Sequence, residues 1–143
     1  MNLSEMTAEN LMQRTLVTAR ASEKLRDAVQ RMHCEKIQCL LIPPESKGKA
    51  VGILTSKDVV KLLGHEPLSV LEELLVADVM TRPAICVQKD MCVADCVVLM
   101  RMAGIRRVPV LHGSTLVGIL SCSDVFRTVA AALGTCPVAS TGA

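Results

Sequence analysis

Short apolar runs alternate with helix-periodic segments along this chain, and the whole alternation occurs twice. Apolar residues spaced three and four apart predict amphipathic helices over Ser22–Met32 and Met91–Met102. Continuous apolar stretches predict buried strands at Ile37–Ile42 and Arg107–Leu111. The other expected elements are short strands at Leu16–Thr18 and Ile85–Val87, hairpin strands at Val51–Leu54 and Val117–Leu120, and closing helices at Val59–Leu63 and Val125–Leu133 that end at Gly64 and Gly134. The pattern therefore predicts an α/β (α+β) fold.

The two halves are copies of one sequence unit. VGILTSKDV at 51–59 returns as VGILSCSDV at 117–125, with six of nine positions identical. Nearer the amino terminus, Met12 matches Met80 at an offset of 68 residues, and the offset falls to 66 after a hairpin loop. We therefore predict two tandem copies of one structural unit. The organisation is repeat 1 at 8–64, a linker at 65–75 with a short helix that starts at Pro67, repeat 2 at 76–134 and a disordered tail at 135–143.

One such unit has too little sheet to bury both faces of its strands. We therefore expect the repeats to be pseudo-twofold-related, to pack through their sheets around a shared core, and to leave two related clefts between them. Gly104 is expected to cap the helix that precedes it.

Composition narrows the class of protein. Half of the residues are apolar, but the only aromatic residue is one Phe, so the core must be aliphatic. The absence of aromatic stacking platforms and a net charge of only +2 argue against binding of a nucleic acid polymer. No apolar run reaches the roughly 18–20 residues of a membrane span, and the polar amino terminus does not resemble a targeting peptide. We expect a soluble, cytoplasmic protein without a membrane partner.

Seven cysteines raise the alternatives of a metal site or disulfides. They lack any C-x-x-C spacing, and their number is odd. Most occupy apolar positions of the repeat, where a free cysteine packs as a small hydrophobe. We expect structural packing, no metal ligation, and no disulfides in a reducing cytosol.

A hydroxyl and a carboxylate recur three residues apart, as Thr55 and Asp58 and as Ser121 and Asp124. One interpretation is a capping box at a helix start. The other is a ligand site, because a helix amino terminus is ready to bind an anion and a carboxylate there can accept from vicinal ribose hydroxyls. Duplication favours the ligand site without excluding the cap.

These motifs resemble the tandem cystathionine-β-synthase-type (CBS) domain pair, also called a Bateman module. Two strands ending in G-I-L-[TS]-x-x-D each lead into a helix. DVMTRP at 78–83 is similar to the opening segment of that family, and GIRRVPV at 104–110 is similar to its central strand. The resemblance covers residues 8–133 and implies two β-α-β-β-α CBS repeats.

The resemblance also implies a ligand. Clefts of this family bind adenosine-containing molecules such as AMP, ADP, ATP or S-adenosylmethionine, as regulatory ligands rather than cofactors. Asp58 and Asp124 would hold ribose hydroxyls, and Arg106 with Arg107 would reach the phosphate of a ligand on Asp58. The residues that we assign to ligand binding are Gly52, Ile53, Thr55, Lys57, Asp58, Arg106, Arg107, Pro109, Gly118, Ile119, Ser121, Ser123 and Asp124. A solvated strand end remains the alternative for the arginines, and an exposed helix start for Lys57.

The repeats differ where phosphate would bind. Repeat 1 has Gln38 and Cys39 where repeat 2 has Arg106 and Arg107, so we expect one stronger site, on Asp58.

No nucleophile elbow or P-loop is present in the sequence, and the histidines share no motif, so we do not expect an enzyme. The leading hypothesis is a ligand-sensing regulatory module that acts on a protein partner, and the alternative is a ligand-free scaffold. A homodimer is expected, with Val125, Phe126 and Val129 either at its interface or packed internally.

Overall fold

The computed structural model of the chain describes residues 2–134 and 137. It divides into two compact units: unit 1 combines residues 1–14 with the chain from Cys86 onward, and unit 2 contains Thr15–Ile85. Apart from Pro137, the predicted tail at 135–143 lies outside the described residues. No helix of the described part is long and apolar enough to span a membrane.

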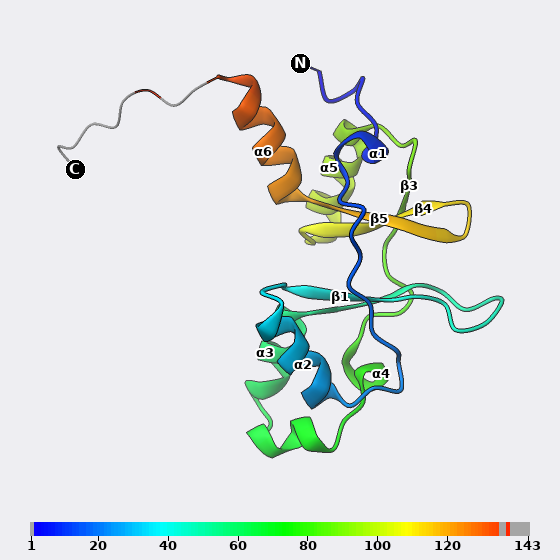
Figure 1. Ribbon diagram of the computed structural model, residues 1–143, viewed down its shortest axis with the longest axis vertical. Coiled ribbons are helices and arrows are strands. Elements are labelled where there is room, and N and C mark those ends of the chain that lie inside the picture. The colour runs from blue at the N-terminus through cyan, green and yellow to red at the C-terminus, as the bar shows by residue number, and fades with distance from the viewer. Residues whose placement is uncertain (1, 135–136, 138–143) are drawn as a thin grey trace. The chain divides into compact units, whose positions relative to one another are not determined.

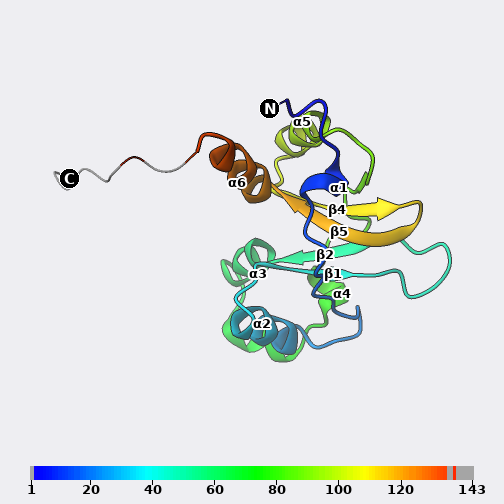
Figure 2. The same ribbon diagram turned by 45° about the horizontal axis from the view of Figure 1, so that its top comes forward.

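Unit 2 is a two-stranded antiparallel sheet with helices on one side (Figures 1 and 2). Its elements are α2 (Leu25–Cys34), β1 (Cys39–Ile42), β2 (Gly52–Thr55), α3 (Ser56–Leu63), a 3-10 helix η1 (Leu68–Glu72) and α4 (Val76–Val79). The register pairs Cys39 with Thr55 and Ile42 with Gly52. The hairpin therefore delivers the chain directly from β2 into the first turn of α3.

Unit 1 repeats this plan with a longer sheet. Its elements are α1 (Ala8–Leu11), β3 (Val87–Gln88), α5 (Val93–Ala103), β4 (Arg107–His112), β5 (Thr115–Ser121) and α6 (Cys122–Ala132). The strand order is β3-β4-β5, with β3 parallel and β5 antiparallel to β4. In unit 1, β5 leads into α6 as β2 leads into α3 in unit 2.

The compact units exchange the segments that open the sequence repeats. We call residues 8–14 and 76–85 the lead-in segments. Gln13 exchanges two backbone hydrogen bonds with Ile119 of β5, at 2.8 and 3.0 Å, so the lead-in segment of repeat 1 lies in unit 1. Thr81 exchanges two with Ile53 of β2, at 2.8 and 3.0 Å, so the lead-in segment of repeat 2 lies in unit 2.

Each unit has its own aliphatic core. In unit 1 the buried residues include Val93, Cys96, Met100, Val108 and Leu120. The core of unit 2 contains the corresponding set of Leu25, Ala28, Met32, Leu40, Ile42 and Leu54. The aliphatic core predicted from the composition is confirmed.

The cysteine prediction holds for one residue and is wrong for two. Cys96 is completely buried in the core. Cys34 and Cys122 are exposed, because they occupy the last position of α2 and the first position of α6, where side chains face solvent. The pKa of the Cys96 thiol is raised from its usual value of 9.0 to about 11, chiefly by burial and in smaller part by the charges of the neighbouring Cys92 and Asp95.

Most predicted elements are present, with shifted ends. The α2 helix begins at Leu25 rather than Ser22, and Leu16–Thr18 is not a strand but a single parallel bridge from Thr18 to β1. Gly104 caps α5 in the left-handed conformation, with φ of +68°, as predicted. The helices after each motif begin three residues earlier than predicted, because Thr55 and Ser121 themselves are the N-caps.

Candidate functional site

Each copy of the hydroxyl–carboxylate motif forms a capping box. The Thr55 hydroxyl oxygen accepts a hydrogen bond from the Asp58 amide at 3.2 Å, and the Asp58 carboxylate accepts one from the Thr55 amide at 2.9 Å. Ser121 and Asp124 make the same exchange at the start of α6, at 3.1 and 2.8 Å. The capping interpretation is confirmed. It does not exclude a ligand, because the cap itself uses only one carboxylate oxygen of each aspartate.

The glycine three residues before each hydroxyl lets a lead-in segment approach the strand closely. A Cβ on Gly118 would lie 2.4 Å from Met12 Sδ and 3.0 Å from the Gln13 carbonyl oxygen. A Cβ on Gly52 would lie 3.1 Å from Met80 Sδ. Both glycines therefore have a packing role, and their expected contact with a ligand stays a prediction.

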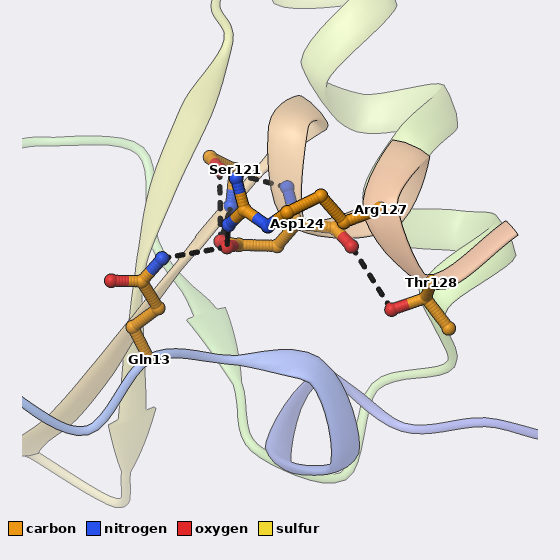
Figure 3. Close-up of polar contacts among 5 residues, drawn as sticks. All are labelled: Gln13, Ser121, Asp124, Arg127 and Thr128. Carbon is orange, nitrogen blue, oxygen red and sulfur yellow. Dashed lines mark hydrogen bonds and ion pairs between the residues drawn. The ribbon is translucent and has the colours of Figure 1, made fainter. Parts of the chain in front are cut away.

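The Asp124 carboxylate is buried, with 5% of its side chain exposed, and it is surrounded by donors (Figure 3). Oδ2 accepts from both the amide and the hydroxyl of Ser121, each at 2.8 Å. Oδ1 accepts from Gln13 Nε2 at 2.8 Å and from the guanidinium of Arg127. Both oxygens are thus occupied by the protein itself. The backbone carbonyl of Asp124 also accepts from Thr128 Oγ1, at 3.0 Å.

The Asp58 carboxylate is half-buried and has fewer donors. The Thr55 amide donates to Oδ2, and no side chain in the described part of the chain donates to Oδ1. An acceptor oxygen at the amino end of a helix is therefore available for a ligand hydroxyl.

The arginine pair lies beside the second motif. Arg107 begins β4 and pairs in register with Ser121, and the Arg106 carbonyl accepts from the Cys122 amide at 2.8 Å. Arg106 is exposed and Arg107 half-buried. Both belong to unit 1, whereas Asp58 belongs to unit 2, so their contact with a phosphate of a ligand on Asp58 stays a prediction.

The remaining assigned residues differ in accessibility. Lys57 and Ser123 are exposed in the first turns of α3 and α6. Pro109 is fully buried, and it pairs with the half-buried Ile119 across the β4–β5 ladder. Ile53 is half-buried on β2. Among the residues that the structure describes, no group of three His, Cys, Asp or Glu side chains is suited to hold a metal ion.

Comparison with known proteins identifies the duplicated unit. The family model described as "CBS domain" matches the chain twice, at residues 8–65 and 76–131. The chain belongs to the CBS domain family. The fold of its structural neighbours agrees, since these are CBS domain pairs of mixed helices and strands.

Two further proteins are similar to this chain in sequence or structure. An uncharacterized protein of Methanopyrus kandleri, MK0525, is 31% identical over 118 residues, which are 80% of this chain and 58% of the relative. The chain thus spans little more than half of that relative's length. A hexameric CBS-CP12 protein from bloom-forming cyanobacteria is 29% identical, with a TM-score of 0.79 over 93% of this chain and 76% of that one.

One solved relative contains ligands. The CBS domain pair of protein MJ0100 was crystallised in complex with 5′-methylthioadenosine and S-adenosyl-L-methionine. It is 26% identical to this chain, with a TM-score of 0.75, and the match covers 89% of this chain and 98% of that one.

Sequence reasoning missed two residues of the second motif. Gln13 lies in a lead-in segment 111 residues before Asp124, and no local pattern links the two. Arg127 was detectable, because it follows Asp124 by three positions on a helix, where opposite charges meet.

Proposed function

We propose that this chain is a regulatory module that binds an adenosine-containing ligand, with the ribose hydroxyls on Asp58. The observation that carries the proposal concerns a half-buried carboxylate at the start of α3, in a motif duplicated in a CBS pair: its Oδ1 accepts no hydrogen bond from the residues that the structure describes. Two vicinal hydroxyls can both donate to such a carboxylate. The adenosine compounds bound to the MJ0100 domain pair support the ligand class.

Regulation would follow from a population shift. A ligand that binds one conformation of the module more tightly than another changes the balance between them, and a protein partner that contacts the module responds to that change. We propose no chemistry on the ligand, so the module is a sensor rather than an enzyme.

Thermal unfolding with AMP, ADP, ATP, NAD and S-adenosylmethionine tests this proposal. A ligand at 100 times its dissociation constant stabilises the folded state by about 2.7 kcal/mol. For a chain of this size that corresponds to a rise of roughly 5–10 °C in Tm. Asp58→Ala should abolish the rise. Asp78→Ala is the matched control, because Asp78 also accepts from an N-cap amide, at the start of α4, but lies outside the motif.

A ligand-free interaction scaffold is the second candidate. The absence of any Tm response across the panel would favour it over sensing.

We also propose that the module forms a homodimer through the exposed apolar side of α6. Phe126, the only aromatic residue, is 72% exposed, whereas Val125 is buried in the core and takes the internal role. Leu133 and Met102, which are also exposed, add apolar surface in the same unit. The assembly of a CBS relative as a hexamer supports self-association. Phe126→Asp should convert a dimer into a monomer in sedimentation, and an unchanged sedimentation coefficient would contradict this interface.

A further inference from the structure

The two motif carboxylates share a backbone geometry but differ in what surrounds them. Asp124 accepts four hydrogen bonds from the protein, and Asp58 accepts one from the described residues. A carboxylate has about four lone-pair positions, so the acceptor capacity of Asp124 is filled and that of Asp58 is not.

Asp124 accepts three more hydrogen bonds than Asp58: one comes from the Ser121 hydroxyl, and the other two follow from sequence differences. Arg127 follows Asp124 by three residues and pairs with it, whereas Lys61 follows Asp58 by three residues and makes no ion pair with it. Gln13 donates to Asp124 from its lead-in segment.

The position equivalent to Gln13 is Thr81, since each makes the same two backbone hydrogen bonds with the isoleucine that follows the motif glycine. The shorter side chain of Thr81 makes no hydrogen bond with Asp58 among the described residues. The donors on Asp124 are therefore particular to unit 1.

We propose that Gln13 and Arg127 occupy the ligand-binding positions of Asp124. The chain then has one open ribose site, on Asp58, and a second motif that its own side chains keep closed. This inference rests on the proposed function for the identity of the ligand, and it adds which motif accepts that ligand and which residues decide it.

The hydrogen bonds explain why a ribose does not displace these donors. A neutral hydroxyl would replace the guanidinium of Arg127, so the carboxylate would lose a fully charged partner and gain an uncharged one. Loss of one such bond weakens binding roughly tenfold. Because the carboxylate is 5% exposed, a ligand would also have to move Gln13 before reaching Oδ1.

A reciprocal exchange tests the proposal. The opening variant combines Gln13→Thr with Arg127→Lys, and the closing variant combines Thr81→Gln with Lys61→Arg. Titration calorimetry with AMP and with S-adenosylmethionine should give one site in the wild type and two in the opening variant. The closing variant should bind at least tenfold more weakly. Two sites of equal affinity in the wild type, or one site of unchanged affinity in the opening variant, would contradict the proposal that Gln13 and Arg127 keep ligand off Asp124.

A second measurement needs no ligand. Asp58→Ala and Asp124→Ala remove the same capping box, so the difference between them reports the additional contacts of Asp124 with Gln13, Arg127 and the Ser121 hydroxyl. In urea unfolding, Asp124→Ala should lower the midpoint more than Asp58→Ala, and equal shifts would overturn the closure. If neither probe binds any variant, the proposed function fails, while the urea comparison still decides whether Asp124 is held by its own chain.

Discussion

Gln13 donates its side-chain amide to Asp124 across 111 residues of sequence, at 2.8 Å. This hydrogen bond attaches the lead-in segment of the first repeat to the helix start of the second, within one compact unit. The two copies of the motif in this CBS pair therefore differ. The Asp124 carboxylate holds other segments of the chain in place, whereas the Asp58 carboxylate has an oxygen that accepts no hydrogen bond from the described residues.

Gly118→Ala should destabilise unit 1 by about 1–3 kcal/mol, the usual cost of overpacking. The added methyl group would lie 3.0 Å from the carbonyl oxygen of Gln13. That oxygen belongs to the backbone, which cannot rotate away from the methyl group as a side chain can. Gly52→Ala is the matched variant and should cost less, because its closest contact is Met80 Sδ at 3.1 Å, on a flexible side chain. Urea unfolding measures both. A larger loss for Gly52→Ala would contradict the packing described for the two glycines.

Leu54→Ala should lower the free energy of unfolding by about 2–5 kcal/mol, because Leu54 is completely buried and its truncation leaves a cavity in the core of unit 2. Leu68→Ala is the control. That side chain is 71% exposed, so its loss should change stability by no more than about 0.5 kcal/mol. Similar effects of the two substitutions on the urea midpoint would show that the core is not where we place it.

Stability should fall as pH rises above 9. The folded state holds the Cys96 proton more tightly than the unfolded state, since the pKa is raised from 9.0 to about 11. The stabilisation is therefore complete below pH 9 and lost by pH 11, a change of up to about 3 kcal/mol. Urea unfolding between pH 8 and 11 should show a shallower decline for Cys96→Ala than for the wild type. Parallel declines would rule out this thiol as the cause.

Arg106→Ala with Arg107→Ala should weaken binding of AMP and leave binding of adenosine unchanged, because the guanidinium groups are predicted to contact only the phosphate. A tenfold or greater loss for AMP is expected in titration calorimetry. Arg101→Ala, an exposed arginine at the end of α5, is the control for a general loss of positive charge. Equal losses for adenosine and AMP would contradict the phosphate role.

Much of the fold was predictable because it depends on local patterns. The duplicated motif identified the two repeats, and Gly104 marked the end of α5 because a glycine readily adopts the left-handed conformation. The helices α1 and α4 were missed, since four residues are too few to show a helical period.

The site was predictable only in part. Local spacing indicated that Thr55 with Asp58 and Ser121 with Asp124 are helix caps or ligand sites, and the structure confirms the caps. The exchange of lead-in segments between the units depends on long-range backbone pairing, such as that of Gln13 with Ile119, and leaves no local signal. The contact of Gln13 with Asp124 follows from that exchange, so it required the three-dimensional structure, whereas the pairing of Arg127 with Asp124 follows from their spacing on a helix.

A crystal structure of the protein grown with AMP would show directly which of the two motif carboxylates binds the ribose. We predict a bound nucleotide whose ribose hydroxyls lie within hydrogen-bond distance of the Asp58 carboxylate, with Gln13 and Arg127 still hydrogen-bonded to Asp124. A ribose bound on Asp124, with Asp58 free of ligand, would contradict this prediction.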